Sequence, residues 1–238
     1  MSHSLTEAER SALLANRFFA DMPAEARDEV ARRGRGKRLG PGERLFSKGG
    51  PADGVYALLT GSLRYSTVSP SGKEAVLNIL TPGKWLGDIS AWDDDGRTLD
   101  CTALEQAVLM HLNMRDFNHL LDGLPAFARM LLKIQGERIR MLLAWNEALT
   151  KLDAEGRLAT RLLFLMQSHG AGTDQQRIEI GLRLPQELIA SLIGTTRQRV
   201  NQILLAWQER GIVEVRKRSL VILDGKALKR MVDLSSLP

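Results

Sequence analysis

The stretch that decides the fold is PQELIASLIGTTRQRVNQILLAWQERGIVEVRKRSLVIL, residues 185–223. Its first residue is a proline, which suits the first turn of a helix because the missing N–H is not needed there. Gly194 permits a tight turn, and Thr195 and Thr196 can cap a second helix. The second helix has apolar residues at the i, i+3, i+4 and i+7 spacing of one helical face, namely Val200, Ile203, Leu204 and Trp207. With Ile189, Ala190 and Ile193 on the inner face of the first helix, this pattern predicts a helix-turn-helix.

The opposite face of the second helix is polar. Gln198, Asn201 and Gln202 fall on it, away from the apolar stripe. A helix of this kind can lie in the major groove of DNA and contact base edges. The sequence therefore predicts a surface that binds double-stranded DNA.

A basic turn follows this helix. Gly211 ends the helix, and the strand-like runs 212–215 and 220–223 flank Arg216, Lys217 and Arg218. Cations at the tip of such a wing can meet phosphates beside the groove. The alternative is a packing corner with a solvated basic loop. The coincidence of the turn glycine, the apolar inner face, the polar outer face and the basic wing favours DNA binding.

The charge of the chain is unevenly placed. The formal net charge of the 238 residues is +5, and residues 151–238, with 14 Lys and Arg against 9 Asp and Glu, carry all of it. Residues 1–150 have 19 of each sign. This distribution fits a neutral regulatory part joined to a part that binds nucleic acid.

Several classes of protein are not supported by the sequence. Because Cys101 is the single cysteine, a disulfide framework and a cysteine-bound cluster are excluded. We see no catalytic Ser/His/Asp set, metal-ligand spacing or phosphate loop, so we expect neither an enzyme nor a metal protein. No apolar run approaches the roughly 18 residues of a membrane span, and there is no signal-peptide core. We expect a cytoplasmic protein with no membrane contact.

The N-terminal half has the pattern of a β-rich domain. After a short amphipathic helix with overlapping capping boxes, Ser4 with Glu7 and Thr6 with Glu9, β-prone segments alternate with glycine and proline turns. These segments are residues 44–46, 55–59, 62–68, 75–80 and 107–112. Short strands spaced in this way predict an antiparallel barrel or roll.

A long helix connects the two halves. One helical pattern begins at Asn113. The pattern of the long helix begins at Pro125 and runs to about Leu152. Its apolar residues recur at roughly coiled-coil spacing: Phe127, Leu131, Ile134, Ile139, Leu142, Trp145, Leu149 and Leu152. We expect a homodimer along this helix, the alternative being a core helix within one domain. Asp153 is placed to cap a further helix, and residues 177–184 alternate like a strand.

The order of a β-rich domain, a long helix and a winged helix-turn-helix resembles the Crp/Fnr family of bacterial transcription regulators, of the cyclic-AMP receptor type. The most specific stretches are residues 40–61, 83–88 and 194–201. The resemblance implies an α+β chain with a cyclic-nucleotide-binding-type β-roll (1–122), a dimerisation helix (123–152) and a winged helix-turn-helix domain (153–238). It also implies a homodimer on a near-palindromic operator, RNA polymerase as a partner, and a small effector in the β-roll.

The resemblance places the effector site by residue. A short turn and helix start would hold a cyclic phosphate, together with an arginine and a serine that follow about ten residues later. The matching residues here are Gly87, Asp88, Ile89 and Ser90, then Arg97 and Thr98, with Leu142 and Leu143 on the long helix.

Four departures from the family pattern argue against cyclic AMP. Asp88 replaces a glutamate, residues 93–95 and Asp100 add carboxylates close to Arg97, Leu99 and Asp100 replace small and apolar residues, and the two leucines of the long helix cannot hydrogen-bond an adenine. Another small effector, or none, is then the alternative. An ion pair of Arg97 with one of its aspartate neighbours is also open.

The DNA contacts follow from position in the motif. Arg197 suits guanine, while Gln198, Asn201 or Gln202 suits adenine. Phosphate contacts are expected from Gln186, Thr196 and Arg199. Two other functions stay open, a cyclic-nucleotide-binding regulatory protein that acts on a protein partner and a ligand-independent DNA-binding regulator.

Overall fold

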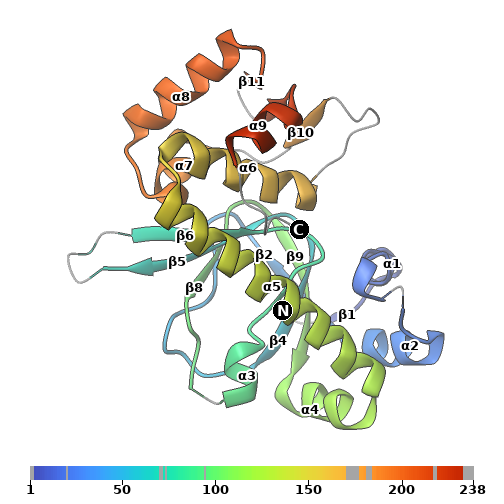
Figure 1. Cartoon of the computed structure of the whole chain (residues 1–238). Coiled ribbons are helices and arrows are strands. Elements are labelled where there is room, and N and C mark those ends of the chain that lie inside the picture. Colours follow the sequence, from blue (N-terminus) through green and yellow to red (C-terminus); the bar gives the residue numbers. More distant parts are fainter. Residues whose placement is uncertain are drawn as a thin grey trace. The chain divides into compact units, whose positions relative to one another are not determined.

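The computed structural model describes residues 3–19, 21–69, 72, 74–93, 95–169, 177–180, 184–216 and 219–232. The chain forms two compact units, Met1–Glu137 and Arg138–Pro238. Helix α5 (Pro125–Lys151) belongs in part to each. Figure 1 shows the elements in chain order.

The first unit contains two antiparallel sheets. One has the strand order β1-β2-β9-β4-β7 and the other β3-β8-β5-β6. Their bounds are β1 His3–Ser4, β2 Arg35–Leu39, β3 Arg44–Phe46, β4 Gly54–Thr60, β5 Leu63–Val68, β6 Glu74–Leu80, β7 Trp85–Leu86, β8 Asp100–Ala103 and β9 Ala107–Asn113. The predicted β-rich roll is confirmed, and each of the five predicted segments is a strand. Strands β2, β7 and β8 were not predicted, because each is short or charged and shows no clear alternation of apolar residues.

The helices of this unit begin in different ways, and side-chain caps are formed by Thr6 and by Asn113. The helices are α1 (Glu7–Leu14), the 3₁₀ turn η1 (Arg17–Phe19), α2 (Ala24–Arg33), α3 (Ile89–Asp93) and α4 (Met114–Gly123). In α1 the capping box is Thr6 with Glu9: the Glu9 amide donates to Thr6 Oγ1 at 3.3 Å and the Thr6 amide to Glu9 Oε2 at 2.9 Å. The overlapping box from Ser4 is not formed, because Ser4 lies in β1.

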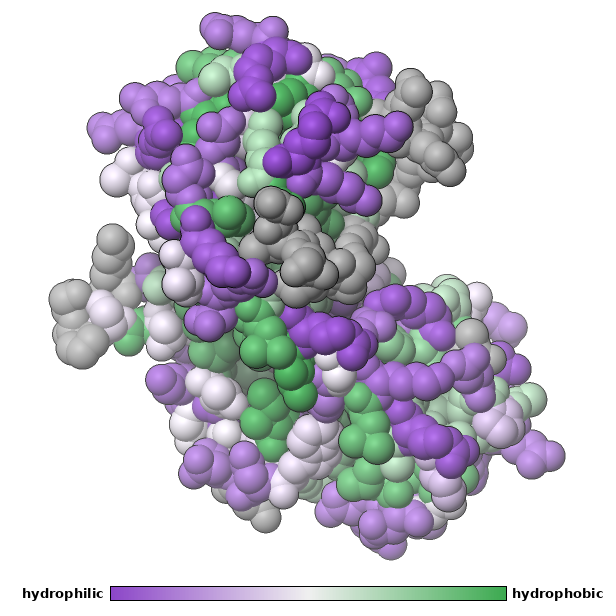
Figure 2. All heavy atoms as spheres, viewed as in Figure 1, coloured by the Kyte–Doolittle hydropathy of each residue, from purple (hydrophilic) through white to green (hydrophobic). Residues whose placement is uncertain are grey.

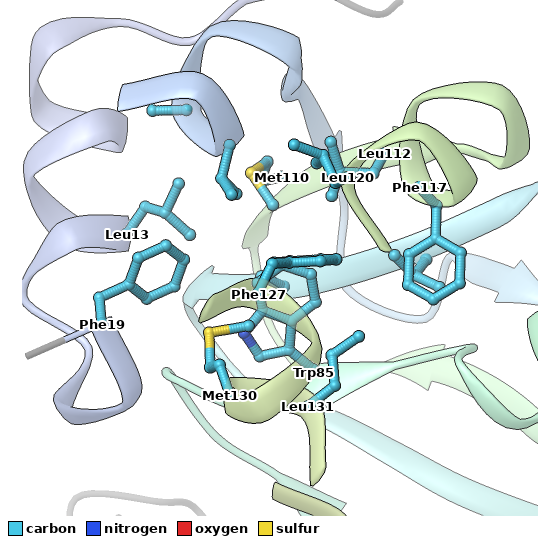
Figure 3. Packing of buried hydrophobic residues seen from close by; sticks show 14 of the residues in the cluster. Leu13, Phe19, Trp85, Met110, Leu112, Phe117, Leu120, Phe127, Met130 and Leu131 are labelled. Atoms are coloured by element: carbon cyan, nitrogen blue, oxygen red, sulfur yellow. The ribbon is translucent and has the colours of Figure 1, made fainter. Parts of the chain in front are cut away.

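The core of the first unit is aromatic and includes the start of α5. Figure 3 shows Phe127 beside Trp85, with Phe117 and Phe19 in the same cluster. The Phe127 ring meets Trp85 edge-on at 5.7 Å and Phe117 at 6.1 Å between ring centroids. The N-terminal turns of α5 are therefore a core helix of this unit.

This packing corrects the predicted apolar seam of the long helix. Phe127, Leu131 and Ile134 are buried in the core of their own domain rather than exposed to a partner. The exposed apolar residues of α5 form a stripe that shares Ile139, Leu142 and Leu149 with the predicted seam and also contains Leu132 and Leu143. Sequence spacing identified the helix but could not separate two apolar faces only part of a turn apart.

The second unit is a winged helix-turn-helix. It contains α6 (Ala154–His169), β10 (Ile178–Ile180), α7 (Gln186–Ile193), α8 (Arg197–Glu209), β11 (Val213–Val215), β12 (Leu220–Ile222) and α9 (Gly225–Met231). The strands form one sheet in the order β10-β12-β11. As predicted, Asp153 caps α6, since its Oδ1 accepts from the Gly156 amide at 2.9 Å.

Candidate functional site

The helix-turn-helix has the predicted geometry. Gly194 lies in the left-handed region at φ 64° and ψ 49°, and ends α7. Thr196 caps α8 with its hydroxyl, which accepts from the Arg199 amide at 3.2 Å. The predicted inner residues are all buried: Ile189, Ala190, Ile193, Val200, Ile203, Leu204 and Trp207. The two helices therefore pack as a unit and leave the outer face of α8 free for other contacts.

That outer face is exposed and polar. Gln198, Asn201 and Gln202 are exposed, and Asn201 accepts a 2.8 Å hydrogen bond from Gln186. Arg197 makes an ion pair with Glu187 at 3.2 Å, and both side chains are about two-thirds exposed or more. Exposed ion pairs contribute roughly 0–1 kcal/mol. The Arg197 guanidinium can therefore exchange this partner for DNA at little cost.

Two arginines of α6 hold the end of α7. Arg157 Nε donates to the Ile193 carbonyl at 2.9 Å, and Arg161 donates to the Leu192 carbonyl at 3.3 Å. Cations at a helix C-terminus satisfy unpaired carbonyls and interact favourably with the helix dipole. Burial lowers the pKa of Arg161 to about 10, so this guanidinium keeps its charge at neutral pH. The sequence reasoning missed both residues, whose i, i+4 spacing on an amphipathic helix was the available signal.

A buried tryptophan holds the C-terminal end of α8 in place. Trp207 is fully buried, and its Nε1 donates to Glu155 Oε1 at 2.6 Å. Arg210 also contacts Glu155, at 3.3 Å. These contacts join the recognition helix to the start of α6.

The described part of the wing carries one of its three predicted cations. Arg216 donates to Glu214 at 2.7 Å and lies 3.5 Å from Glu179. The hydrogen bond to Glu214 raises the pKa of Arg216. Lys217 and Arg218 lie outside the described residues, so the phosphate contact of the wing stays a prediction.

The turn that the family resemblance marks as an effector site lies in the first unit. Gly87 has a φ of 83°, and Asp88 and Ser90 are buried while Ile89 is about half exposed. The Asp88 carboxylate accepts a hydrogen bond from Gln135 of α5. The short helix α3 begins directly after this turn.

Arg97 is buried against the same turn. Its Nη1 donates to the Gly87 carbonyl at 2.8 Å, and its Nη2 donates to the Gly54 carbonyl at 2.8 Å and forms an ion pair with Asp53. The guanidinium carbon lies 4.5 Å from the Phe46 ring centroid. Arg97 therefore has a carboxylate partner from a segment more than forty residues earlier in the chain.

Asp53 is held from its other side by an aromatic residue. The Tyr56 hydroxyl donates to Asp53 Oδ2 at 2.5 Å, and the Tyr56 ring stacks on His111 at 4.5 Å. Burial raises the pKa of Asp53, but the hydrogen bonds from Tyr56 and Arg97 outweigh it and lower this pKa below its ordinary value. Burial and the Asp53 carboxylate raise the pKa of Tyr56. Asp53 is thus ionised, and Tyr56 neutral, around neutral pH.

The remaining predicted effector residues are divided between the two units, so their part in one site stays a prediction. Thr98 is exposed, and Leu142 and Leu143 are exposed on the part of α5 that belongs to the second unit. The expected alternative was an ion pair of Arg97 with an aspartate close to it in the sequence. Arg97 does form an ion pair, but its partner is Asp53. Asp100 instead accepts from the Lys48 amide at 3.0 Å and lies 3.5 Å from Arg44. Asp53 and Gln135 were missed, because nothing in their sequence surroundings distinguishes them from surface residues.

Replacing Gly87 by alanine tests this packing. A Cβ there would lie 2.4 Å from Arg97 Nη1, at a positive φ that L-residues rarely adopt. We expect a loss of at least about 2 kcal/mol in the unfolding free energy, measured by urea denaturation, since strain and a clash add. Gly194→Ala is the matched control, since its φ is also positive but nothing lies within 4 Å of the added Cβ. It should cost only about 1 kcal/mol, and equal losses in both variants would contradict the proposed clash.

Other kinds of site can be addressed only for the described residues. Among them, no three His, Cys, Asp or Glu side chains gather as a metal site would require. Within the same residues, no helix is long and apolar enough to cross a membrane.

A β-roll, a long helix and a winged helix-turn-helix with an exposed polar recognition face define a DNA-binding regulator with an effector-type domain. Residues 36–123 match the cyclic nucleotide-binding domain model, and residues 156–231 match the Crp-like helix-turn-helix domain model. The chain belongs to the Crp/Fnr family of bacterial transcription regulators.

Relatives with assigned functions are similar over most of the chain. A CRP-like cAMP-activated global transcriptional regulator from Mycobacterium tuberculosis is 28% identical over 192 residues, which cover 79% of this chain and 84% of the relative. The transcriptional activator Anr from Pseudomonas aeruginosa is 26% identical over 200 residues, covering 83% and 79%. Among solved structures, a CRP-family transcriptional regulator from Thermus thermophilus is 25% identical, with a TM-score of 0.67 over 84% of this chain and 98% of that one.

Proposed function

We propose that this regulator acts as a homodimer that pairs through the exposed stripe of α5. The stripe residues Leu132, Ile139, Leu142 and Leu149 are separated by seven, three and seven residues, spacings that fit the a and d positions of a heptad repeat. Figure 2 shows apolar surface on the face over which α5 runs in Figure 1. Large exposed apolar side chains in a row are typical of an interface. A second copy of the same helix would cover them.

Such a dimer would bind a near-palindromic operator. Two copies of α8 related by a two-fold axis contact half-sites about one DNA turn apart. The observation that supports this proposal is the exposed polar face of α8 on a fully buried inner face. In our assignment Arg197 and Gln198 contact the first base pairs, and Asn201 or Gln202 contacts adenine. Gln186, Thr196, Arg199 and the wing residues 216–218 would contact phosphates.

The rest of the chain would supply control. We assign residues 1–122 to the effector-type domain, 123–152 to the dimerisation helix and 153–238 to DNA binding. The activity would be regulation of transcription rather than catalysis, with RNA polymerase as a further partner at the promoter. Because bacterial DNA lies in the cytoplasm, we expect the protein to act there. A small effector bound in the β-roll would control the protein, as cAMP does in the relative that is described as cAMP-activated.

Replacing Arg197 by alanine tests the DNA-binding assignment. Loss of its paired hydrogen bonds to guanine should lower operator affinity by about 1–3 kcal/mol and relax one half-site position. The measurement is binding to a panel of operator variants at fixed salt, with the operator first selected from random DNA. Arg230→Ala, which removes an exposed arginine of α9, is the control. Unchanged affinity and unchanged base preference in Arg197→Ala would refute the assignment.

The same selection separates this function from its alternative. A cyclic-nucleotide-binding subunit that acts on a protein partner would select no DNA sequence. Recovery of a two-fold symmetric sequence supports the dimeric regulator. Failure to enrich any sequence would favour the alternative.

A further inference from the structure

The strongest unexplained feature of the first unit is the internal ion pair between Arg97 and Asp53. The Arg97 side chain is only 1% exposed, whereas that of Asp53 is 52% exposed. The guanidinium is thus covered, whereas its carboxylate partner is about half open to solvent. A ligand that approaches Arg97 from the Asp53 side meets a negative charge first.

The hydrogen bonds of Arg97 are directed inward. Its two Nη atoms bond to the carbonyls of Gly87 and Gly54 and to the Asp53 carboxylate, and the Phe46 ring packs on the guanidinium carbon at 4.5 Å. Arg97 Nε is buried and has no hydrogen-bond partner among the residues that the structure describes. A phosphate that needs a two-pronged contact with the guanidinium would therefore have to displace Asp53.

Asp53 is held firmly in this position. The Tyr56 hydroxyl donates to its second oxygen at 2.5 Å, and Tyr56 itself is fully buried and stacked on His111. The Lys37 ammonium also contacts this ring, at 5.5 Å from the Tyr56 ring centroid. The charged and titratable groups that act on Asp53 are Arg97, Tyr56 and His111, with Lys37 beside the Tyr56 ring, and the hydrogen bonds from Tyr56 and Arg97 lower the pKa of the carboxyl group and keep it ionised.

A second internal contact holds the turn itself. Asp88, at the position where the family pattern has a glutamate for the ligand, is buried and accepts a hydrogen bond from Gln135. Gly87 is fixed by Arg97 through its carbonyl. Asp88 and Arg97, the two charged side chains that would bind a cyclic nucleotide, therefore both have partners within the chain.

We propose that Asp53 is a built-in counter-ion that takes the place of an anionic ligand on Arg97, so that the domain is closed to free cyclic nucleotides. The Arg97–Asp53 pair then fixes the turn at 87–90 in the way that a bound phosphate would. This inference rests on the proposed function in one respect: DNA binding by this regulator is independent of cyclic nucleotides.

The first test uses the unmodified protein. Calorimetric titration with cyclic AMP and cyclic GMP should give no binding heat, and operator affinity should be the same with and without either nucleotide. Tight binding of either nucleotide to the wild-type protein would overturn the proposal. Because the titration needs no DNA, its result stands even if operator binding fails, and failure of operator binding alone would refute only the proposed function.

The second test removes the counter-ion. In Asp53→Asn the charge of Arg97 is uncompensated, so the melting temperature should fall by about 2–4 °C or more, and inorganic phosphate should restore part of that loss relative to chloride at equal ionic strength. Asp21→Asn, which breaks the exposed ion pair with Lys133, is the matched control and should show neither effect. The double variant Asp53→Asn with Arg97→Ala should lose the phosphate response. An Asp53→Asn protein with wild-type stability and no phosphate response would overturn the proposal. If this variant does not fold, the nucleotide titration of the wild-type protein decides between the two outcomes.

Discussion

Replacing Ile139 and Leu142 by lysine in the same chain is expected to make the protein monomeric and to weaken operator binding by about 10²–10⁴-fold. The two residues are 56% and 67% exposed on α5, so neither is part of the buried core formed by the described residues. In a dimer each would be buried, and burial of one such side chain contributes about 1.5–3 kcal/mol. Lysine at the seam opposes its copy in the partner. The loss in DNA affinity is the avidity of two linked binding modules.

Sedimentation and a DNA shift assay measure this prediction. Circular dichroism should show wild-type helix content, because the substitutions leave each folded unit unchanged. Val68→Lys is the control, since Val68 is 53% exposed on β5, outside the stripe. A double variant that stays dimeric at micromolar concentration would place the dimer axis elsewhere on the molecule.

Replacing Trp207 by alanine should cost the second unit about 3–5 kcal/mol of unfolding free energy. The indole is fully buried between α8 and the start of α6, and the substitution leaves both a cavity and a carboxylate, Glu155, without its 2.6 Å donor. Operator binding should be lost at temperatures where the unit melts. Urea denaturation followed by circular dichroism is the measurement.

A conservative change at the same position separates packing from the hydrogen bond. Trp207→Phe keeps most of the buried volume, and Glu155 retains Arg210. We expect a loss of about 1–2 kcal/mol and operator binding close to that of the wild type at low temperature. Equal losses in the alanine and phenylalanine variants would mean that the hydrogen bond, not the packing, holds α8.

Most of the fold could be predicted because its signals are local. The turn glycine, the cap at Thr196 and the apolar stripe of α8 all act within a few residues, and each was found where the sequence placed it. Helix α2 and strand β2 escaped because their charged sequences hide which residues are buried. Along α5 the spacing was right, but the first residues of the predicted seam are buried in the core of the first unit, since periodicity measures rotation and carries no information on what a face contacts.

The partners of the polar groups in the effector-type turn were harder to predict from the sequence. Arg97 and Asp88 were found through the family pattern, but their partners Asp53 and Gln135 lie 44 and 47 residues away along the chain. An aspartate in a glycine-rich turn looks the same whether it is solvated or paired with a buried guanidinium. Pairings of this kind depend on the tertiary structure and have no local pattern.

The contact between Trp145 and Arg161 has a mechanical consequence. The Arg161 guanidinium lies 4.2 Å from the Trp145 ring centroid while it donates to the last turn of α7. Arg161 of α6 therefore joins the final turns of α5 to α7, the helix that packs against the recognition helix α8. Because these contacts all lie within the second unit, we expect the last turns of α5 to move together with α6 and α7 as one body.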